Sequence, residues 1–201
     1  MASARKRFGQ HFLHDPATIA RIVEAVDAQP GAAVVEIGPG RGAPTGRLLE
    51  AARALDAVEI DRDLAAALRA AYAGRPEFTL HEADALRFDF AALAAARGRP
   101  LRIVGHLPYN ISTPLMFHLL HEPAAIRDLH VMLQREVIER ICAAPGGSDY
   151  GRLTVMLAPW VEAVALFEVG PGAFRPPPQV WSAGARLTGR PEPAFAGDAR
   201  Y

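Results

Sequence analysis

The ten residues 33–42, AVVEIGPGRG, decide the fold of this chain. The apolar run at 33–37 is typical of a short buried strand, and it stops at Gly38-Pro39-Gly40, which predicts a tight turn. Glycine allows a backbone to take turns that other residues resist and to approach a ligand closely. A helix is expected directly after the turn, over residues 45–54, with Thr45 as its candidate cap.

Strands and helices alternate along the rest of the chain. Apolar positions at helical spacing predict helices over residues 16–28, 45–54, 62–73, 91–97, 113–121 and 135–143. Short apolar runs predict strands over residues 33–37, 57–61, 78–81, 101–105, 128–133, 154–157, 164–169 and 181–187. The alternation predicts an α/β, Rossmann-like fold with an open, mostly parallel seven-stranded sheet and helices on both of its faces. Ligands of such sheets bind beyond the carboxyl ends of the strands.

Composition limits the class of protein. The 201 residues are 50% hydrophobic, which suffices for one well-formed core. Lys plus Arg and Asp plus Glu number 22 each, so the global charge gives no indication of a nucleic-acid partner. The single cysteine, Cys142, excludes an internal disulfide, and no Cys/His cluster has the spacing of a zinc site. The sequence shows neither a signal peptide nor a membrane-spanning stretch, so we expect a cytoplasmic protein without a membrane partner.

The turn at residues 38–42 does not have the pattern of a dinucleotide site. Such a site uses Gly-x-Gly-x-x-Gly to place a pyrophosphate on backbone amides, whereas Pro39 has no amide to donate. A ligand without phosphates fits better, and S-adenosylmethionine has none. Glu59, at the end of the second strand, could then accept both ribose hydroxyls, and Asp84 could accept from the adenine amine. Taken alone, Glu59 and Asp84 are ordinary loop carboxylates, and Glu36 is either a ligand contact or an acid that holds the turn.

A second group of residues, GHLPYNIS at 105–112, follows the fourth strand. The chain carries further motifs in a fixed order, namely RKRFGQHFL at 5–13, VEIGPG at 35–40, EIDRDL at 59–64, LPYNISTPL at 107–115, YGRL at 150–153 and FRPPP at 174–178. In this order they resemble the KsgA family, the dimethyltransferases of small-subunit ribosomal RNA. The resemblance extends over residues 5–187, and it implies a class I S-adenosylmethionine-dependent methyltransferase in which Gly38 and Gly40 contact the cofactor.

The resemblance implies methyl transfer to N6 of adenine, twice on each target. The exocyclic amine of adenine is a poor nucleophile because its lone pair is delocalised into the ring, so an enzyme must accept its hydrogen bonds and aim the lone pair at the methyl group. In the family an Asn or Asp side chain and a backbone carbonyl near the proline are the acceptors, at the positions of His106 and Leu107 here. Tyr109 then stacks on the flipped base and Phe174 closes over its other face. Direct transfer needs no metal and no covalent intermediate, and positioning supplies much of the catalysis.

The N-terminal segment also takes its role from the resemblance. Residues 1–15 form a basic segment that covers the cofactor, with His11 and Leu13 touching it. The run Arg5-Lys6-Arg7 resembles contacts to the RNA backbone, so binding through it should weaken steeply with salt. Arg175 is a candidate contact to phosphate, although a surface cation explains it equally well.

Several positions depart from the family pattern. His106 stands where the family has Asn, and neutral imidazole accepts a hydrogen bond in only one tautomer. Protonation near pH 6–7 would remove that acceptor. Arg41 would place an unfavourable like charge near a sulfonium if it pointed inward. Gly184 and Ala185 replace larger apolar residues, which should thin the packing of the last strand.

The main hypothesis is an enzyme that dimethylates adenines of 16S ribosomal RNA during ribosome biogenesis, as a monomer that binds the small ribosomal subunit. Two alternatives stay open: an erythromycin-resistance-type methyltransferase of 23S ribosomal RNA, and a catalytically weak RNA-binding assembly factor. A nicotinamide-dependent dehydrogenase is disfavoured by the glycine pattern. The methyltransferase domain is expected over 16–188, and 189–201 as a loose tail or the start of a truncated domain, with the family's C-terminal helical domain absent.

Overall fold

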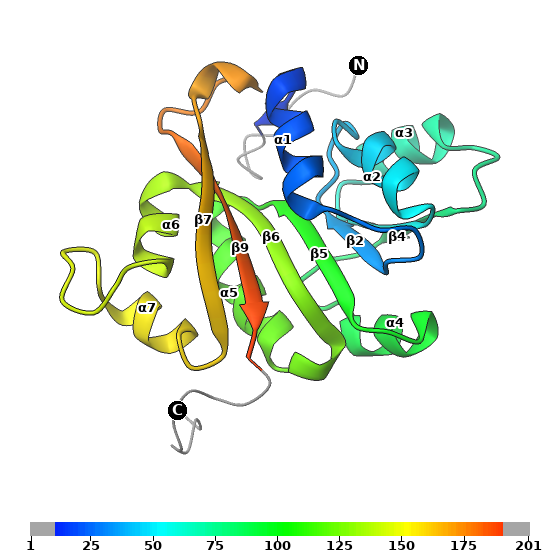
Figure 1. Ribbon diagram of the computed structural model, residues 1–201. Coiled ribbons are helices and arrows are strands. Elements are labelled where there is room, and N and C mark those ends of the chain that lie inside the picture. The colour runs from blue at the N-terminus through cyan, green and yellow to red at the C-terminus, as the bar shows by residue number, and fades with distance from the viewer. Residues whose placement is uncertain (1–10, 191–201) are drawn as a thin grey trace.

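A seven-stranded sheet forms the centre of the computed structural model, which describes residues 11–190 except the side chains of Tyr109 and Asn110. Its strand order is β4-β3-β2-β5-β6-β9-β7 (Figure 1). The strands are β2 (Val34–Ile37), β3 (Leu55–Glu59), β4 (Phe78–Glu82), β5 (Leu101–His106), β6 (Ile126–Gln134), β7 (Val161–Val169) and β9 (Ser182–Gly189). In this sheet only β9 runs antiparallel to its neighbours. The predicted open, mostly parallel seven-stranded sheet is therefore confirmed.

Helices cover both faces of the sheet, as predicted (Figure 1). The helices are α1 (Pro16–Val26), α2 (Thr45–Ala52), α3 (Arg62–Ala71), α4 (Phe90–Arg97), α5 (Tyr109–Leu120), α6 (Arg135–Ile141) and α7 (Arg152–Leu157), with short 3-10 helices η2 (Pro123–Ala125) and η3 (Pro171–Ala173). Side chains of α1 and α2 pack on one face, and those of α4 to α7 pack on the other, where they form the larger core. None of the helices within residues 11–190 is long and apolar enough to span a membrane.

Two predicted elements differ in the structure. The strand predicted at 154–157 is wrong, because these residues lie in α7, where Thr154 and Leu157 are buried and Val155 and Met156 are exposed. Apolar positions three residues apart fit one face of a short helix, whereas a strand would alternate. Helix α5 begins at Tyr109 rather than at 113, because the Pro108 carbonyl accepts hydrogen bonds from the amides of Ile111 and Ser112. The GHLPYNIS motif is thus a strand-to-helix junction.

A small antiparallel pair joins two distant parts of the chain. Strand β1 (Phe12–Leu13) pairs with β8 (Phe174–Arg175), with Leu13 opposite Phe174. The His14 amide donates to the Ala173 carbonyl at 2.9 Å. His11 Nδ1 lies 2.8 Å from the Pro176 carbonyl oxygen. The pair holds the residues before α1 against the segment that follows β7, at the carboxyl edge of the sheet.

Candidate active site

The glycine turn after β2 leaves one side open to a ligand. Gly38 and Gly40 have φ of +64° and +58°, a backbone conformation that L side chains rarely adopt. A Cβ at Gly38 would meet no protein atom within 4 Å, whereas one at Gly40 would lie 3.3 Å from the Phe12 ring. The Gly38 amide donates to the Val58 carbonyl at 2.9 Å, which fixes the turn against the end of β3. The backbone of Gly38 is therefore fixed in position, and the space beside its Cα is free for a ligand.

Glu59 fastens the glycine turn to the next strand. Its Oε2 accepts a hydrogen bond from the Gly40 amide at 3.1 Å, and its Oε1 accepts one from the Asp61 amide at 2.9 Å. Burial raises the pKa of this carboxyl, although the hydrogen bonds from Asp61 and Gly40 lower it in part. Glu59 is 5% exposed, so it is not a solvated loop carboxylate. Each of its oxygens still has a lone pair for another donor.

Asp84 lies beyond the end of β4, the strand beside β3. Its Oδ1 accepts a hydrogen bond from the Leu86 amide at 2.9 Å, and the residue is partly exposed. Glu59 and Asp84 thus stand at the carboxyl ends of adjacent strands, as the sequence predicted. They lie outside the lining of the pocket that holds the other candidate residues.

Glu36 is a buried acid that holds the turn to α2. It is 2% exposed, and its Oε2 accepts a hydrogen bond from Thr45 Oγ1 at 2.7 Å. Burial raises the pKa of Glu36 to about 7, and the charge of Glu59 adds to the shift. The prediction that Thr45 caps the helix is wrong: Pro44 is the N-cap and makes no side-chain hydrogen bond, since the Thr45 hydroxyl is used by Glu36.

His106 and Phe174 come together at the end of β5. Their ring centroids are 5.0 Å apart and the ring planes are tilted by 35°. Met132 is the β6 partner of His106, and it packs in the same small core cluster as Phe174. Phe174 is 1% exposed, so its ring is fixed from several sides. The strand ends bring together two residues that are far apart in the sequence, and both were predicted to hold the target base.

Burial lowers the pKa of His106 to about 4, and the charge of His11 adds to the effect. The prediction that His106 loses its acceptor near pH 6–7 is therefore wrong. The imidazole stays neutral at pH 7 and keeps one unprotonated nitrogen.

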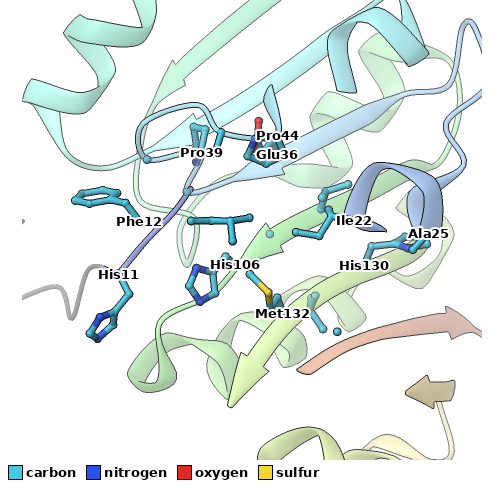
Figure 2. A pocket seen from close by; sticks show the side chains of 18 of the residues that line it. His11, Phe12, Ile22, Ala25, Glu36, Pro39, Pro44, His106, His130 and Met132 are labelled. Atoms are coloured by element: carbon cyan, nitrogen blue, oxygen red, sulfur yellow. The ribbon is translucent and has the colours of Figure 1, made fainter. Parts of the chain in front are cut away.

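A pocket that is partly open to solvent lies between the glycine turn, the strand ends and α1. Figure 2 shows His11 and Phe12 at one end, His106 and Met132 in the middle, and Ile22 and Ala25 of α1 farther along. The pocket brings together five predicted cofactor residues, namely His11, Leu13, Gly38, Gly40 and His106.

The remaining predicted residues have different outcomes. Leu107 is 3% exposed, and its amide donates to the Met132 carbonyl at 3.2 Å. Tyr109 begins α5, but its side chain lies outside the described residues, as do Arg5-Lys6-Arg7. Arg175 is exposed.

Two further pocket residues are Arg41, whose direction the sequence left open, and His130, which was not predicted. The Arg41 guanidinium lies 4.5 Å from the centroid of the Phe12 ring, a cation–π contact. The Arg41 guanidinium thus packs on the Phe12 ring. His130 lines the pocket at 6% exposure, and its Nε2 lies 3.6 Å from Asp128 Oδ1, beyond hydrogen-bond distance. The two-residue period of β6 places His130 on the same face as Met132, a signal that could have found it.

The fold and this edge of the sheet define a class of protein. A mostly parallel seven-stranded sheet with one antiparallel strand, an open glycine turn after its first strand and an acid after the next is that of a class I S-adenosylmethionine-dependent methyltransferase. The family model described as "Ribosomal RNA adenine dimethylase" matches residues 1–199. The chain belongs to this family, and S-adenosylmethionine is its methyl donor.

Relatives and solved structures agree with this assignment. A curated relative from Marinobacter nauticus, "Ribosomal RNA small subunit methyltransferase A", is 56% identical over 92% of this chain and 66% of its own length. The structure of the 23S rRNA methyltransferase ErmE has a TM-score of 0.78 and 35% identity, over 92% of this chain and 72% of that one. A dimethyladenosine transferase from Plasmodium falciparum has a TM-score of 0.78 and 29% identity, over 90% of this chain and 64% of that one. This chain spans about two thirds of the length of its curated relatives.

Proposed function

We propose that this chain transfers methyl groups from S-adenosylmethionine to N6 of adenines in 16S ribosomal RNA, and dimethylates them during ribosome biogenesis. The proposal includes action in the cytoplasm, as a monomer, on the small ribosomal subunit. The observation that carries it is that His106 lines the same pocket as the open side of Gly38 and contacts the Phe174 ring. The names of the curated relatives, which specify the small subunit, support the choice of RNA.

The residues around the glycine turn fit the cofactor. The open side of Gly38 admits a ligand, and the lone pairs left on Glu59 suit ribose hydroxyls. The free oxygen of Asp84 can accept from the adenine amine of the cofactor, and His11 and Leu13 cover it from the β1 side. When bound, S-adenosylmethionine supplies an electrophilic methyl group on a sulfonium.

The junction between β5 and α5 orients the target amine. Neutral His106 offers one nitrogen as an acceptor, and the Leu107 carbonyl is the second acceptor in our proposal. Together they direct the nitrogen lone pair toward the methyl group, and the proton released on transfer passes to solvent. Tyr109 and Phe174 supply the stacking faces. Because Phe174 is 1% exposed and lies against His106, its ring must move before an adenine can stack on it.

Transfer of tritiated methyl groups to undermethylated small ribosomal subunits tests this function. We expect the wild-type chain to label the RNA, and N6,N6-dimethyladenosine to be the labelled nucleoside after complete digestion. The variant His106→Asn, which restores the family's residue, serves as the comparison. Absence of label with the wild-type chain, together with label from the variant, would refute the enzyme assignment for this chain.

Two other functions have specific support. The resemblance to the ErmE structure favours 23S ribosomal RNA as the alternative substrate, and label in naked 23S RNA but not in small subunits would establish it. His106 favours a catalytically weak assembly factor. That function predicts binding of S-adenosylmethionine, measured by calorimetry, without transfer to either RNA.

A further inference from the structure

Trp181 is an exposed aromatic residue at the edge of the sheet that carries the candidate site. Its side chain is 49% exposed, and it directly precedes β9. The first residue of β9, Ser182, pairs with Gln134 at the end of β6 and with Val169 at the end of β7. Trp181 therefore lies at the carboxyl ends of the parallel strands, the edge at which His106 is found.

The backbone of Trp181 is held at a defined position. Its carbonyl accepts a hydrogen bond from the Arg135 amide at 2.9 Å, directly after β6 ends. Part of the indole lies against Gly170, because a Cβ at that glycine would meet the indole ring at 3.7 Å. The rest of the ring is open to solvent, and the neighbouring Val180 is also 46% exposed. A large apolar ring is thus presented outward on a fixed support.

One exposed cation, Arg135, follows the end of β6 directly beside the Trp181 backbone, and its side chain is 47% exposed. The Arg135 guanidinium lies 3.4 Å from Glu139 and 3.8 Å from Glu168, so these acids neutralise part of its charge in the free protein. A phosphate can compete for such exposed ion pairs because each contributes little. Aromatic faces beside cations are the usual contacts of single-stranded nucleic acid.

The distance from the candidate base site suits a neighbouring nucleotide. Residues 175–181 lead from Phe174, which contacts His106, to Trp181. Across the sheet, β6 alone separates β5 from β9, a distance of about 10 Å, and Trp181 lies three residues, about 10 Å, beyond the row of His106 along the strands. A chain that places its adenine at His106 and continues along this edge reaches Trp181 within a few nucleotides.

We infer that Trp181 stacks on an unpaired nucleotide that flanks the target adenine in single-stranded RNA. This inference rests on the proposed function, since it takes the adenine to be seated at His106. It adds a contact outside the base and cofactor pockets, one that contributes to RNA affinity and leaves the chemistry of transfer to the pocket.

The chain offers a direct optical test, because its 2 tryptophans are Trp160 and Trp181. Trp160 is partly buried against the main core directly before β7, so it lies at the amino ends of the parallel strands, whereas Trp181 lies at their carboxyl ends. The variant Trp160→Phe leaves Trp181 as the only indole, and Trp181→Phe is the matched control. An oligoadenylate of about ten nucleotides is the probe, titrated at constant salt. We expect strong quenching of fluorescence in Trp160→Phe and little in Trp181→Phe.

Affinity gives the second measurement. Trp181→Ala should weaken binding of the oligoadenylate about 5- to 150-fold, and Trp181→Phe, which keeps an aromatic face, should weaken it less. Thermal unfolding and binding of S-adenosylmethionine establish that each variant is folded. Unquenched Trp181 fluorescence at saturating RNA, or equal affinity of folded Trp181→Ala and wild type, would overturn the inference. Because this test measures RNA binding and not methyl transfer, it gives a result even if the chain proves to have no enzyme activity.

Discussion

His106 determines how the proposed reaction depends on pH. Burial lowers the pKa of its imidazole to about 4, so the acceptor nitrogen is free at pH 7 and becomes protonated only near pH 4. We expect the single-turnover rate of methyl transfer to stay flat as the pH falls from about 8 to 5, and to drop below that. His106→Asn, which has no group that titrates there, is the control. A loss of rate centred near pH 6.5 in the wild type would contradict this assignment.

The same residue is expected to determine the rate constant of methyl transfer. His106→Leu keeps a side chain of similar bulk and removes the acceptor, so we expect the rate constant of transfer to fall about 100-fold, the usual effect of removing one such hydrogen bond. Affinity for S-adenosylmethionine, measured by calorimetry, separates this effect from any loss of the cofactor contact predicted for His106. An unchanged rate in a folded His106→Leu variant, measured by single turnover, would mean that the target amine does not use the imidazole.

Glu36 makes stability depend on pH in the opposite direction to an ordinary acid. Its pKa is about 7 in the folded protein, above its ordinary value of 4.5, so its contribution is fully present below pH 4.5 and is lost as the pH rises through 7. This difference corresponds to up to about 3 kcal/mol of unfolding free energy. We expect Glu36→Gln to gain stability relative to wild type between about pH 5 and pH 8, measured by urea unfolding. Parallel pH dependence of the two proteins would show that the carboxyl does not titrate as described.

At the scale of the element, the glycine turn and a helix end provide a matched pair. Gly38 in the turn and Gly98 at the end of α4 have φ of +64° and +67°, and a Cβ at either would meet no atom within 4 Å. Alanine at either position should lower the free energy of unfolding by about 1–2 kcal/mol, because the left-handed conformation is strained. Only Gly38→Ala should also weaken binding of S-adenosylmethionine, by at least about tenfold. Equal affinity of the two variants, measured by calorimetry, would place the cofactor elsewhere.

The sequence predicted those elements whose apolar residues follow a clear local pattern. The buried strands β2 and β5 read as apolar runs, and the acids after β3 and β4 follow from the shared direction of parallel strands. The segment 154–157 was mistaken for a strand because four residues are too few to separate a period of two from one of 3.6. The pair β1–β8 has two residues in each strand and joins distant segments, so no local pattern marks it.

The sequence predicted which residues form the candidate site. It did not predict their burial, pKa values or hydrogen-bond partners. Order along the chain placed Gly38, Glu59 and His106 at strand ends, since the fold brings these ends to one edge. The pKa of His106 depends on tertiary burial, and the use of Thr45 by Glu36 depends on how α2 packs on β2. The sequence did not determine the direction of the Arg41 side chain either, which in the structure packs on the Phe12 ring. Such properties arise from contacts between distant residues, which a sequence pattern does not encode.

At the scale of the whole molecule, the pair β1–β8 closes the candidate site from outside. It links residues before the first helix to residues that follow β7. Strand β1 lines the pocket, and Phe174 of β8 contacts His106, which also lines it. If the pair must open for the cofactor to leave, a bound cofactor opposes that opening by mass action. Two-residue strands have few hydrogen bonds of their own, so we infer that the free protein opens here more easily than in the central sheet.

Hydrogen exchange should therefore detect the cofactor at β1 and β8. With S-adenosylmethionine at 100 times its dissociation constant, the open form becomes about 100-fold rarer, equivalent to about 2.7 kcal/mol. We expect exchange of the amides at 12–14 and 173–175 to slow by up to this factor, measured by mass spectrometry of the corresponding peptides. Helix α4 packs on the opposite face from α1 and is the internal control, since its exchange should change least. Bound cofactor without slower exchange at β1 and β8 would mean that the cofactor enters and leaves past a closed pair, and that the N-terminal segment does not cover it.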